Sequence, residues 1–493
     1  MTSSSVLEAR VFPRLYRDSV NLMALASALE KAEGVIRVGA VMGTPANLEI
    51  LERSQMLPEE LAAIPDDLVI VVRGVDQAAV TAALGTAAAS LTEVREDRPA
   101  SRPSPATVAE GIAAATKAGR EPNLVAISVP GMYAAVVSEQ ALRRGLHVFC
   151  FSDNMAIEDE VRLKRLAVDS GLLLMGPDCG TAIVDGRPLG FANVVRSGSV
   201  GIVAASGTGA QEVSCLLDRA GAGISQLIGV GGRDLSASVG GLMTRHAVRL
   251  LAADNDTGAI VVVSKPPAPE VADRLLAELA RAGKPAVACL LGMDDAEGPV
   301  QVRGTLEGGA RAAAELLGLS LPIADPPVAT GPARRVLGLF AGGTLASEAK
   351  VLLDGAGVEA EVVDLGADEY TVGRPHPMID PGYRTECIAA AGSRPEVGVL
   401  LLDVVLGHAA SAEPTLPLIE AIGIARAAAR DDGRELVVVA SVCGTGGDPQ
   451  GLARQRELLE SAGVIVCDSN ASAARTAAVL AGAVQNAVEG ESR

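Results

Sequence analysis

The sequence contains no tryptophan, and aromatic residues make up only 2% of its 493 residues. The interior must therefore be built from Ala, Val, Leu and Ile, a composition that suits parallel β-sheets covered by helices. None of the seven Cys lies in a C-x-x-C spacing, so the sequence indicates no metal site and favours a reducing compartment.

Positive charge is also scarce, because 42 Lys and Arg stand against 60 Asp and Glu and leave a net charge of −18. This excess disfavours nucleic acids and anionic membranes as partners. It does not exclude small anionic substrates, since local Arg side chains and helix N-termini can reverse the field. The segment MTSSSVLEAR lacks the apolar core of a signal peptide, and no stretch approaches the length of a membrane span. We therefore expect a cytoplasmic protein.

Two copies of one strand–turn–helix pattern are the most informative feature of the sequence. The first, GSVGIVAASGTGAQE at 198–212, runs from a buried strand through a Gly-rich turn into an amphipathic helix. The second, GLFAGGTLASE at 338–348, repeats the order of strand, Gly-Thr, and Glu four residues after the Thr. We expect Thr208 to cap the first helix, with Gln211 completing a capping box. Because the first N–H groups of a helix lack helical partners, each turn is predicted to bind an anionic group.

The length predicts about three domains at roughly 150 residues each, all of the α/β class. Residues 1–97 follow a β-α-β-α-β-α pattern that favours a small α+β, ferredoxin-like domain. The Pro-rich stretches 98–106 and 326–333 are predicted linkers. We expect the remaining α/β units at 107–197, 198–325 and 334–493, with polar or Gly-rich loops at the strand ends, where such sheets bind ligands.

The segment from Ser128 to about Ala313 resembles the α subunit of succinyl-CoA synthetase. The resemblance is carried by SVPGMYAAVVSEQAL from Ser128, MGPDC at 175–179, VGIV at 200–203, SGT at 206–208, and GVGG at 229–232 with Asp234. The unit 334–493 looks like that enzyme's second flavodoxin-like ligase domain, fused in one chain. Together with the N-terminal unit and the GRPHPMIDP segment, this arrangement resembles the FdrA family. The resemblance implies a truncated CoA-binding-like Rossmann domain at 107–197, followed by two flavodoxin-like ligase domains at 198–325 and 334–493.

Two features of the synthetase are missing from the sequence. The enzyme carries phosphate on a histidine in a Gly-His-Ala-Gly loop, whereas the equivalent region here, QVRGTLEGGA at 301–310, contains none. Of the four His, His147 falls in a predicted strand and His246 in a predicted helix, so neither fits that loop. The Gly-rich CoA turn is also missing, because the linker enters directly at about residue 107. We therefore expect neither a phosphohistidine nor a cofactor.

The FdrA resemblance implies one subunit of a multi-subunit oxamate carbamoyltransferase of purine (allantoin) catabolism. That enzyme interconverts oxalurate plus phosphate with oxamate plus carbamoyl phosphate. Carbamoyl transfer needs a tightly held dianion, a positioned carboxylate and donors aimed at the developing oxyanion, but no covalent enzyme intermediate. The expected partners are small anions (oxamate or an analogue, phosphate, carbamoyl phosphate), other subunits and further copies of the chain. Two alternatives stay open, an ATP-dependent acyl-CoA synthetase and a non-catalytic regulatory or scaffold subunit.

The candidate catalytic residues are Arg374 and His376, in a loop that two prolines stiffen, and His408. The candidate phosphate- and substrate-binding residues lie in turns and at strand ends: Ser206, Gly207, Thr208, Gly209, Gly231, Gly232, Arg233, Gly342, Gly343, Thr344, Arg384, Asn154, Cys443, Gly444 and Thr445.

Each of these candidates has a structural alternative. The two Gly-Thr turns can simply be capped, Arg233 can pair with Asp234, and Asn154 can cap the helix that follows it. The loop of His376 can be a rigid surface turn, and His408 can be packed or can start a helix. Cys443 is not expected to be a nucleophile, because no His or acid is placed to activate it.

Overall fold

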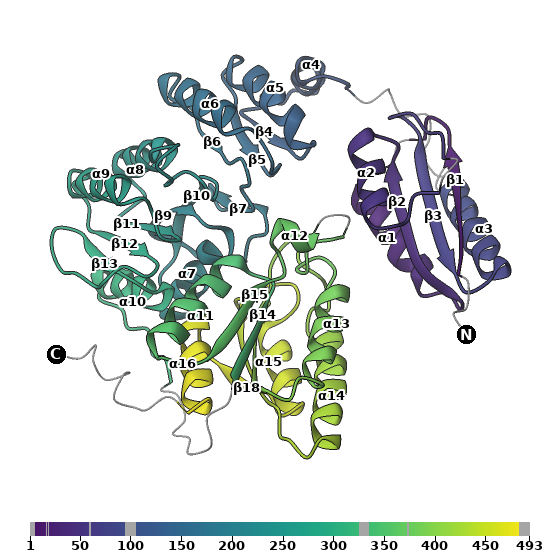
Figure 1. The fold of residues 1–493 in the computed structure, drawn as a ribbon. Helices are drawn as coiled ribbons and strands as arrows, with labels where there is room; N and C mark the ends of the chain where they lie inside the picture. Colours follow the sequence, from purple (N-terminus) through teal and green to yellow (C-terminus); the bar gives the residue numbers. More distant parts are fainter. Residues whose placement is uncertain are drawn as a thin grey trace. The chain divides into compact units, whose positions relative to one another are not determined.

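The computed structural model describes residues 5–15, 17, 19–58, 61–93, 105–324, 335–371 and 374–482. The chain divides into two compact units, residues 1–104 with 368–375, and residues 105–367 with 376–493 (Figure 1). The predicted linker 326–333 lies outside the described residues, as do residues 98–104 of the linker 98–106. Within the described residues, no helix is both long and apolar enough to cross a membrane.

The first unit is a three-stranded antiparallel sheet in the order β1-β3-β2. Strands β1 and β2 both pair antiparallel to β3, so they run parallel to each other with β3 between them, as in the split β-α-β arrangement of ferredoxin-like folds. Helices α1 and α3 cover one face of the sheet, and α2 with the loop after it covers the other. The predicted small N-terminal domain is therefore present. Its elements are β1 (Val6–Phe12), α1 (Ser19–Glu30), β2 (Val35–Met42), α2 (Pro45–Arg53), β3 (Leu68–Gly74) and α3 (Gln77–Glu93).

The second unit begins with a small parallel sheet in the order β4-β5-β6. This part resembles half of a Rossmann domain, as predicted for residues from 107 onward. Its apolar residues share one core with the next sheet, because Phe149 and Leu174 belong to the same buried cluster as Val203 and Val262. Its elements are α4 (Val108–Lys117), β4 (Leu124–Ile127), α5 (Gly131–Leu142), β5 (His147–Cys150), α6 (Ile157–Asp169) and β6 (Leu174–Met175).

A seven-stranded sheet follows, in the order β13-β12-β11-β9-β10-β7-β8. The hairpin β7–β8 belongs to this sheet, because β7 pairs antiparallel with β10. The sheet therefore begins at Thr181, earlier than the predicted boundary at residue 198. Its elements are β7 (Thr181–Val184), β8 (Arg187–Gly190), β9 (Ser197–Ala205), α7 (Gly207–Ala220), β10 (Ile224–Gly229), α8 (Leu242–Ala253), β11 (Ala259–Ser264), α9 (Pro269–Ala280), β12 (Ala286–Leu290), β13 (Gln301–Arg303) and α10 (Leu306–Leu316).

The last sheet is parallel and five-stranded, in the order β15-β14-β16-β17-β18. Numbered from β14, this is the order 2-1-3-4-5 of flavodoxin-like folds, which confirms the predicted class. The short helix α12 (Asp368–Thr371) groups with the first unit. The other elements are β14 (Arg335–Phe340), α11 (Gly343–Gly355), β15 (Ala360–Asp364), α13 (Gly382–Ala391), β16 (Val397–Val405), α14 (Leu416–Asp431), β17 (Val437–Cys443), α15 (Leu452–Ser461), β18 (Ile465–Cys467) and α16 (Asn470–Leu480).

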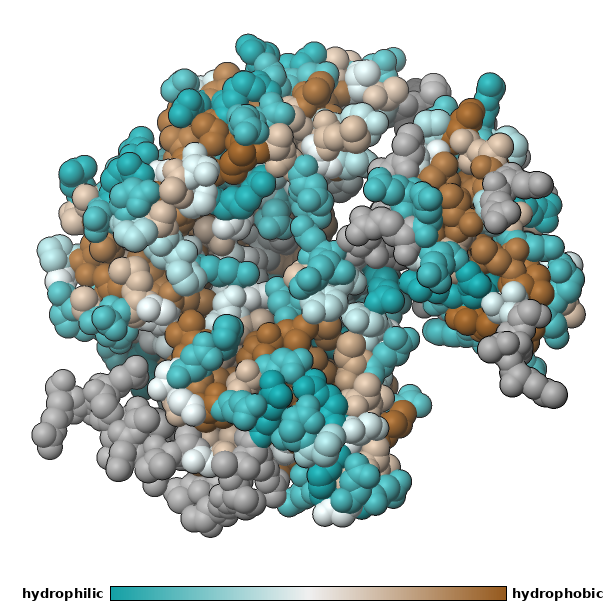
Figure 2. Space-filling view, viewed as in Figure 1, coloured by the Kyte–Doolittle hydropathy of each residue, from teal (hydrophilic) through white to brown (hydrophobic). Residues whose placement is uncertain are grey.

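The two large sheets share a layer of helices, because α7 and α10 on one sheet pack against α11 and α16 on the other. The contact is reciprocal. Glu212 of α7 accepts a hydrogen bond from the first N–H of α16, at Asn470 (2.9 Å), and Glu348 of α11 accepts one from the first N–H of α10, at Leu306 (2.6 Å). Each carboxyl group thus satisfies an N–H donor at the start of a helix from the other half. Hydrophilic and hydrophobic residues are interspersed on the face seen in Figure 2.

Candidate active site

The first Gly-rich turn lies at the start of α7, directly after the buried strand β9. Ser206, not Thr208, is the N-cap, and its Oγ accepts the N–H of Gly209 at 3.0 Å. The expected Thr208–Gln211 capping box is therefore wrong, because the helix begins two residues earlier than predicted. The N–H groups of Gly207 and Thr208 make no hydrogen bond within the described residues, and both residues are only partly buried. These two donors can bind an anion.

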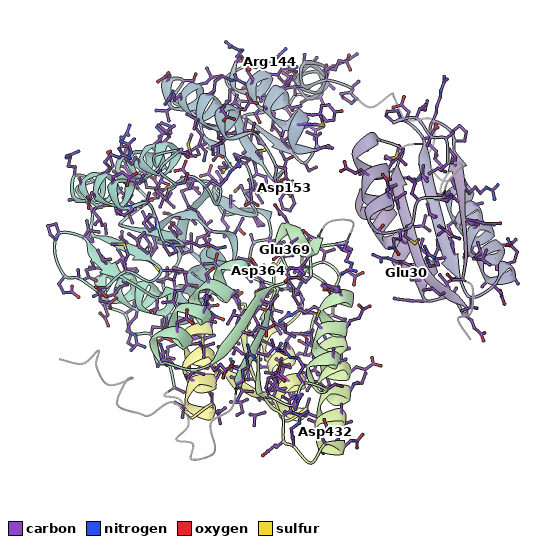
Figure 3. The ribbon with its side chains drawn as sticks, in the orientation of Figure 1. Glu30, Arg144, Asp153, Asp364, Glu369 and Asp432 are labelled. Carbon is purple, nitrogen blue, oxygen red and sulfur yellow. The ribbon has the colours of Figure 1, made fainter. Side chains whose placement is uncertain are left out.

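The second turn, at the start of α11, is filled by the chain's own carboxylates. The carboxylate of Asp403 accepts the N–H of Ala341 at 2.9 Å and that of Gly342 at 2.7 Å. Asp364, labelled in Figure 3, ends strand β15 beside Gly343, where a Cβ on the glycine would lie 2.3 Å from Asp364 Oδ2. A free phosphate at this turn would face two negative charges. The structure therefore distinguishes the two turns, which the sequence predicted to be equivalent.

The two turns meet. Ser206 Oγ and Thr344 Oγ1 lie 2.7 Å apart, and Thr208 Oγ1 accepts the N–H of Thr344 at 3.3 Å. The positive ends of α7 and α11 thus converge on one place, which is unfavourable unless negative charge is near. Asp403 supplies that negative charge for α11. At α7 no protein carboxylate accepts the N–H groups of Gly207 and Thr208 within the described residues, so the positive end of this helix is not compensated.

His376 lies next to the second turn. Its Nδ1 accepts the N–H of Met378 at 3.2 Å, so the proton of the neutral ring is on Nε2. Nε2 faces Gly366, where a Cβ would lie 2.5 Å from Nε2 and 2.8 Å from the carbonyl oxygen of Ala341. The ring of Phe191 packs against the imidazole with centroids 6.0 Å apart. Burial lowers the pKa of His376, an effect that nearby Asp403 opposes. A neutral imidazole with an Nε2–H donor is thereby favoured at neutral pH.

The other two candidate catalytic residues, Arg374 and His408, lie in the loops before α13 and after β16. Arg374 belongs to the segment 368–375, which groups with the first unit, and its backbone N–H donates to Thr371. His408 is exposed, and its backbone N–H donates to the carbonyl oxygen of Ala192 at 2.8 Å. His376 is the candidate catalytic side chain whose contacts at the second turn are described.

Arg384 is buried beneath that turn, 3% exposed. Its Nη2 donates to Asp403 Oδ1 at 2.7 Å, to the Asp403 carbonyl oxygen at 2.8 Å and to the Leu339 carbonyl oxygen at 2.8 Å. Burial lowers the pKa of Arg384, and Asp403 opposes that shift. Arg384 thus holds Asp403 in place against the amides of Ala341 and Gly342.

The Gly231–Asp234 loop is a structural joint. A Cβ on Gly231 (φ +85°) would lie 2.2 Å from the Pro177 carbonyl oxygen, so the glycine is needed for close packing. Arg233 pairs with Glu160 Oε2 at 2.8 Å, not with Asp234 as the alternative expectation had it, and Gly232 is exposed. Asp234 is fully buried, and its carboxylate caps α8 and pairs with Lys164. The partners of Arg233 and Asp234, Glu160 and Lys164, both come from α6, and their side chains are 0% exposed.

The Cys443–Gly444–Thr445 segment is also structural. Thr445 Oγ1 donates to the carbonyl oxygen of Val194, and the carboxylate of Asp448 accepts the N–H groups of Val194 (2.7 Å) and Thr445 (2.8 Å). Asp448 therefore fastens the segment before β9 to the end of β17. Cys443 is 1% exposed, and contact with Cys215 together with burial raises the pKa of its thiol well above the ordinary value. These features agree with the expectation that Cys443 is no nucleophile.

Asn154 is exposed with φ +52° and does not cap α6. Helix α6 begins after Ala156, and no side chain caps it. The capping expectation for Asn154 is therefore wrong.

Sequence reasoning missed the residues that shape the second turn, namely Asp364, Asp403 and Phe191. The two carboxylates lie within the last residues of parallel strands, the position where α/β sheets bind ligands, and this placement was the available signal. Strand β16 continues to Val405, which puts Asp403 inside the strand, with its carboxylate on the N–H groups that precede α11. No sequence signal pairs Phe191 with His376.

Two sheets share a helix layer, one fully parallel and the other parallel except for the hairpin β7–β8. Together with a Gly-rich strand-to-helix turn in each, they define a succinyl-CoA-synthetase-like protein. Family models agree: "CoA-ligase" matches residues 339–480, "CoA binding domain" matches residues 195–291, and "AllF, heavy metal-associated domain" matches residues 3–106. The CoA-binding match falls on β9 to β12, one unit later than residues 107–197.

The chain belongs to the FdrA-like family of these proteins. It is 39% identical over 497 residues to the uncharacterized protein YahF of Escherichia coli (strain K12), an alignment that covers 93% of this chain and 95% of YahF. Succinate–CoA ligase α subunits match over a shorter segment. The α-2 subunit of Trichomonas vaginalis is 29% identical and the α 2 subunit of Archaeoglobus fulgidus is 30% identical, each over 147 residues, 29% of this chain. These alignments cover 46% and 50% of those subunits, so the chain spans about half their length.

Among solved structures, acetyl-coenzyme A synthetase 1 of Ca. Korarchaeum cryptofilum aligns over 73% of this chain and 82% of its own, at 15% identity and a TM-score of 0.33.

The heavy-metal description of the N-terminal domain does not fit the residues present. Residues 3–106 contain neither Cys nor His, the side chains that soft metals prefer. Across the described parts of the chain, no group of three or more metal-ligating side chains could hold an ion. The domain thus keeps the fold of that class without its ligands.

Proposed function

We propose that the chain is a subunit of a carbamoyltransferase that interconverts oxalurate plus phosphate with oxamate plus carbamoyl phosphate, without a phosphohistidine or CoA. The AllF-type N-terminal domain supports the link to allantoin catabolism. The observation that carries the proposal is the meeting of the α7 and α11 N-termini, with unused amides on α7 and a neutral imidazole beside α11.

The roles of the two turns follow from which helix N-terminus already has protein carboxylates beside it. The phosphate binds at the N–H groups of Gly207 and Thr208, because the α11 turn holds Asp403 and Asp364. A phosphate oxygen attacks the ureido carbon of oxalurate, the bond from that carbon to the oxamate nitrogen breaks, and the nitrogen gains a proton. The Nε2–H of His376 is the donor aimed at the charge that develops in this step. The other subunits complete the site.

Variants of Gly207 test the phosphate site. A Cβ at this position would lie 3.5 Å from Thr181 Oγ1, an ordinary contact, so substitution is tolerated. Gly207→Asp places a carboxylate on the free amides and stabilises the helix, whereas Gly207→Asn is the matched neutral control. We expect Gly207→Asp to weaken phosphate binding about tenfold or more and Gly207→Asn to change it only about twofold, measured by calorimetry. Equal binding by both variants would show that phosphate does not bind α7.

The activity itself is tested by phosphorolysis of oxalurate, with the chain alone and with its co-purifying proteins. Carbamoyl phosphate is trapped as ATP by an added carbamate kinase. Formation of oxamate and carbamoyl phosphate by the assembled complex supports the proposal. A complex that binds phosphate but forms neither product refutes it.

An acid–thiol ligase is the second candidate, because the CoA-ligase and CoA-binding models both match the chain. Calorimetry with CoA separates the two candidates. Binding of CoA tighter than about 100 μM would favour the ligase, and no heat at millimolar CoA would favour carbamoyl transfer.

A further inference from the structure

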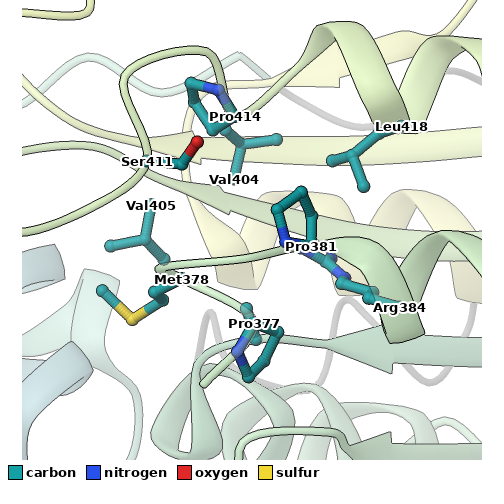
Figure 4. Close-up of a pocket in the computed structure, with 10 residues that line it drawn as sticks. Pro377, Met378, Pro381, Arg384, Val404, Val405, Ser411, Pro414 and Leu418 are labelled. Atoms are coloured by element: carbon teal, nitrogen blue, oxygen red, sulfur yellow. The ribbon is translucent and has the colours of Figure 1, made fainter. Parts of the chain in front are cut away.

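A small pocket lies at the topological switch point of the five-stranded sheet. In the order β15-β14-β16-β17-β18, the strand after β14 is added on one side of it and the later strands are added on the other side. Open α/β sheets bind ligands in the crevice at such a point, here between β14 and β16. The pocket is lined there by Ala341, which follows β14, and by Val405, which ends β16. Figure 4 shows the other walls, which include Met378, Pro381, Ser411 and Leu418.

Arg384 is the only charged side chain that lines this pocket (Figure 4). Its Nε and Nη2 are engaged by the carbonyl oxygens of Leu339 and Asp403 and by the Asp403 carboxylate, at 2.7–3.1 Å. Its Nη1 makes no hydrogen bond within the described residues, and this nitrogen is not fully enclosed by the protein. Two N–H donors on a side chain that is 3% exposed are therefore left for a ligand.

The charge of Arg384 is already balanced, and this decides which ligand fits. Asp403 is 0% exposed and lies 2.7 Å from Nη2. A carboxylate in the pocket would have to be desolvated close to that buried negative charge, between walls of Pro, Met, Val and Leu. A neutral carbonyl oxygen accepts the same N–H groups at a much smaller desolvation cost.

We propose that this pocket binds the carbonyl oxygen of a small neutral amide or ureido group through Arg384 Nη1, with Ser411 beside it. The enclosed part has room for about one water molecule, so one oxygen enters and the rest of the ligand lies in the open mouth. The pocket adjoins His376, because Met378 lines the pocket and its backbone N–H donates to Nδ1 of the imidazole. It thus places an amide end of the substrate near the imidazole, an assignment that rests on the proposed function.

The methyl group of Met378 reports binding without any need for activity. The intact chain is labelled with methyl-13C methionine, and the Met378 signal is assigned with Met378→Leu. Formamide, urea and acetate are titrated to about 100 mM, with oxamate as the bifunctional compound. We expect a saturable shift of this signal with formamide, urea and oxamate, and at least about tenfold weaker binding of acetate.

Two matched variants control the titration. Ser411→Val fills the pocket, and because Ser411 bonds Met378 and Gln450 through its backbone N–H and carbonyl groups, the chain should keep its fold. Ser393→Val makes the same change at an exposed site in the same domain. Ser411→Val should weaken amide binding at least about tenfold and Ser393→Val should leave it unchanged. Acetate binding as tightly as formamide, or no Met378 shift with any amide, would overturn the proposal. Amide binding by a complex that forms no carbamoyl phosphate would leave the pocket standing and refute only the function.

Discussion

Replacing Lys164 by Met tests whether the Gly231–Asp234 loop is a structural joint. The side chain of Lys164 is 0% exposed. Its Nζ donates to Glu160 Oε1 at 2.8 Å, to the Val230 carbonyl oxygen at 2.8 Å and to Asp234 Oδ1 at 2.7 Å. These bonds join α6 to the end of β10 and the start of α8.

The structure sets the size of the effect. Removing one partner of a buried ion pair costs about 3–5 kcal/mol, because the remaining charge is left uncompensated. Both carboxylates keep other partners here, hydrogen-bond donors in the case of Asp234 and an ion pair in the case of Glu160. Asp234 still accepts the N–H groups of Met243 and Thr244, and Glu160 keeps Arg233 at 2.8 Å. We therefore expect Lys164→Met to lower the free energy of unfolding by about 3 kcal/mol, the lower end of that range.

Urea unfolding followed by far-UV circular dichroism measures this loss, since the chain has no tryptophan to report by fluorescence. The matched control is Lys350→Met, because Lys350 pairs with Asp354 at 2.9 Å on the surface, with both side chains more than half exposed. The control should cost less than about 1 kcal/mol. If the free energy of unfolding of Lys164→Met lies within about 1 kcal/mol of the wild-type value, the hydrogen bonds of Lys164 do not hold these elements together.

Three further predictions concern titratable groups. Burial raises the pKa of Glu348 to about 7, so its neutral form stabilises the fold below the ordinary carboxyl pKa and this contribution is lost as the pH rises through about 7. The free energy of unfolding, measured with urea for the wild type and for Glu348→Gln, gives a difference that should fall by about 3 kcal/mol between pH 5 and pH 8. A difference that does not change with pH would contradict the assignment. Phe191→Ala should raise the pKa of His376 toward its ordinary value by admitting water, measured from the imidazole proton signals; an unchanged pKa would show that the ring does not shield it. Iodoacetamide should label half-buried Cys387 in the native protein and leave Cys443 unmodified, as read by mass spectrometry, because Cys443 is buried and the pKa of its thiol is raised. Equal labelling of both would contradict this burial.

Local pattern was enough to predict the repeated strand–turn–helix units. A run of apolar residues such as 200–205 followed by Gly-rich turns specifies a buried parallel strand entering a helix, and both predicted copies are present as β9–α7 and β14–α11. The ferredoxin-like N-terminal domain was recognised in the same way. That residues 301–310 lack the phosphorylatable His followed instead from the resemblance to succinyl-CoA synthetase.

Local pattern did not decide what fills the second turn. Asp403 is 61 residues from Gly342, and Asp364 reaches Gly343 from another strand. Both turns have the same sequence signature, yet only the α11 turn is compensated by protein carboxylates. Thr208 was predicted to cap α7, whereas Ser206 is the cap, and its Oγ also lies 2.7 Å from Oγ1 of Thr344, 138 residues away.

The sequence by itself determined the strand–turn–helix units and the α/β class, because these depend on periodicity and composition within about 15 residues. The absence of a phosphorylatable His followed from the resemblance to succinyl-CoA synthetase. The tertiary structure alone decided that Lys164 is the centre of a buried hydrogen-bond network and that Asp403 occupies one helix N-terminus. It also decided that Nη1 of Arg384 makes no hydrogen bond within the described residues. Charges and carbonyls that are tens to hundreds of residues apart meet only when sheets pack, and no local pattern encodes which of them will be neighbours.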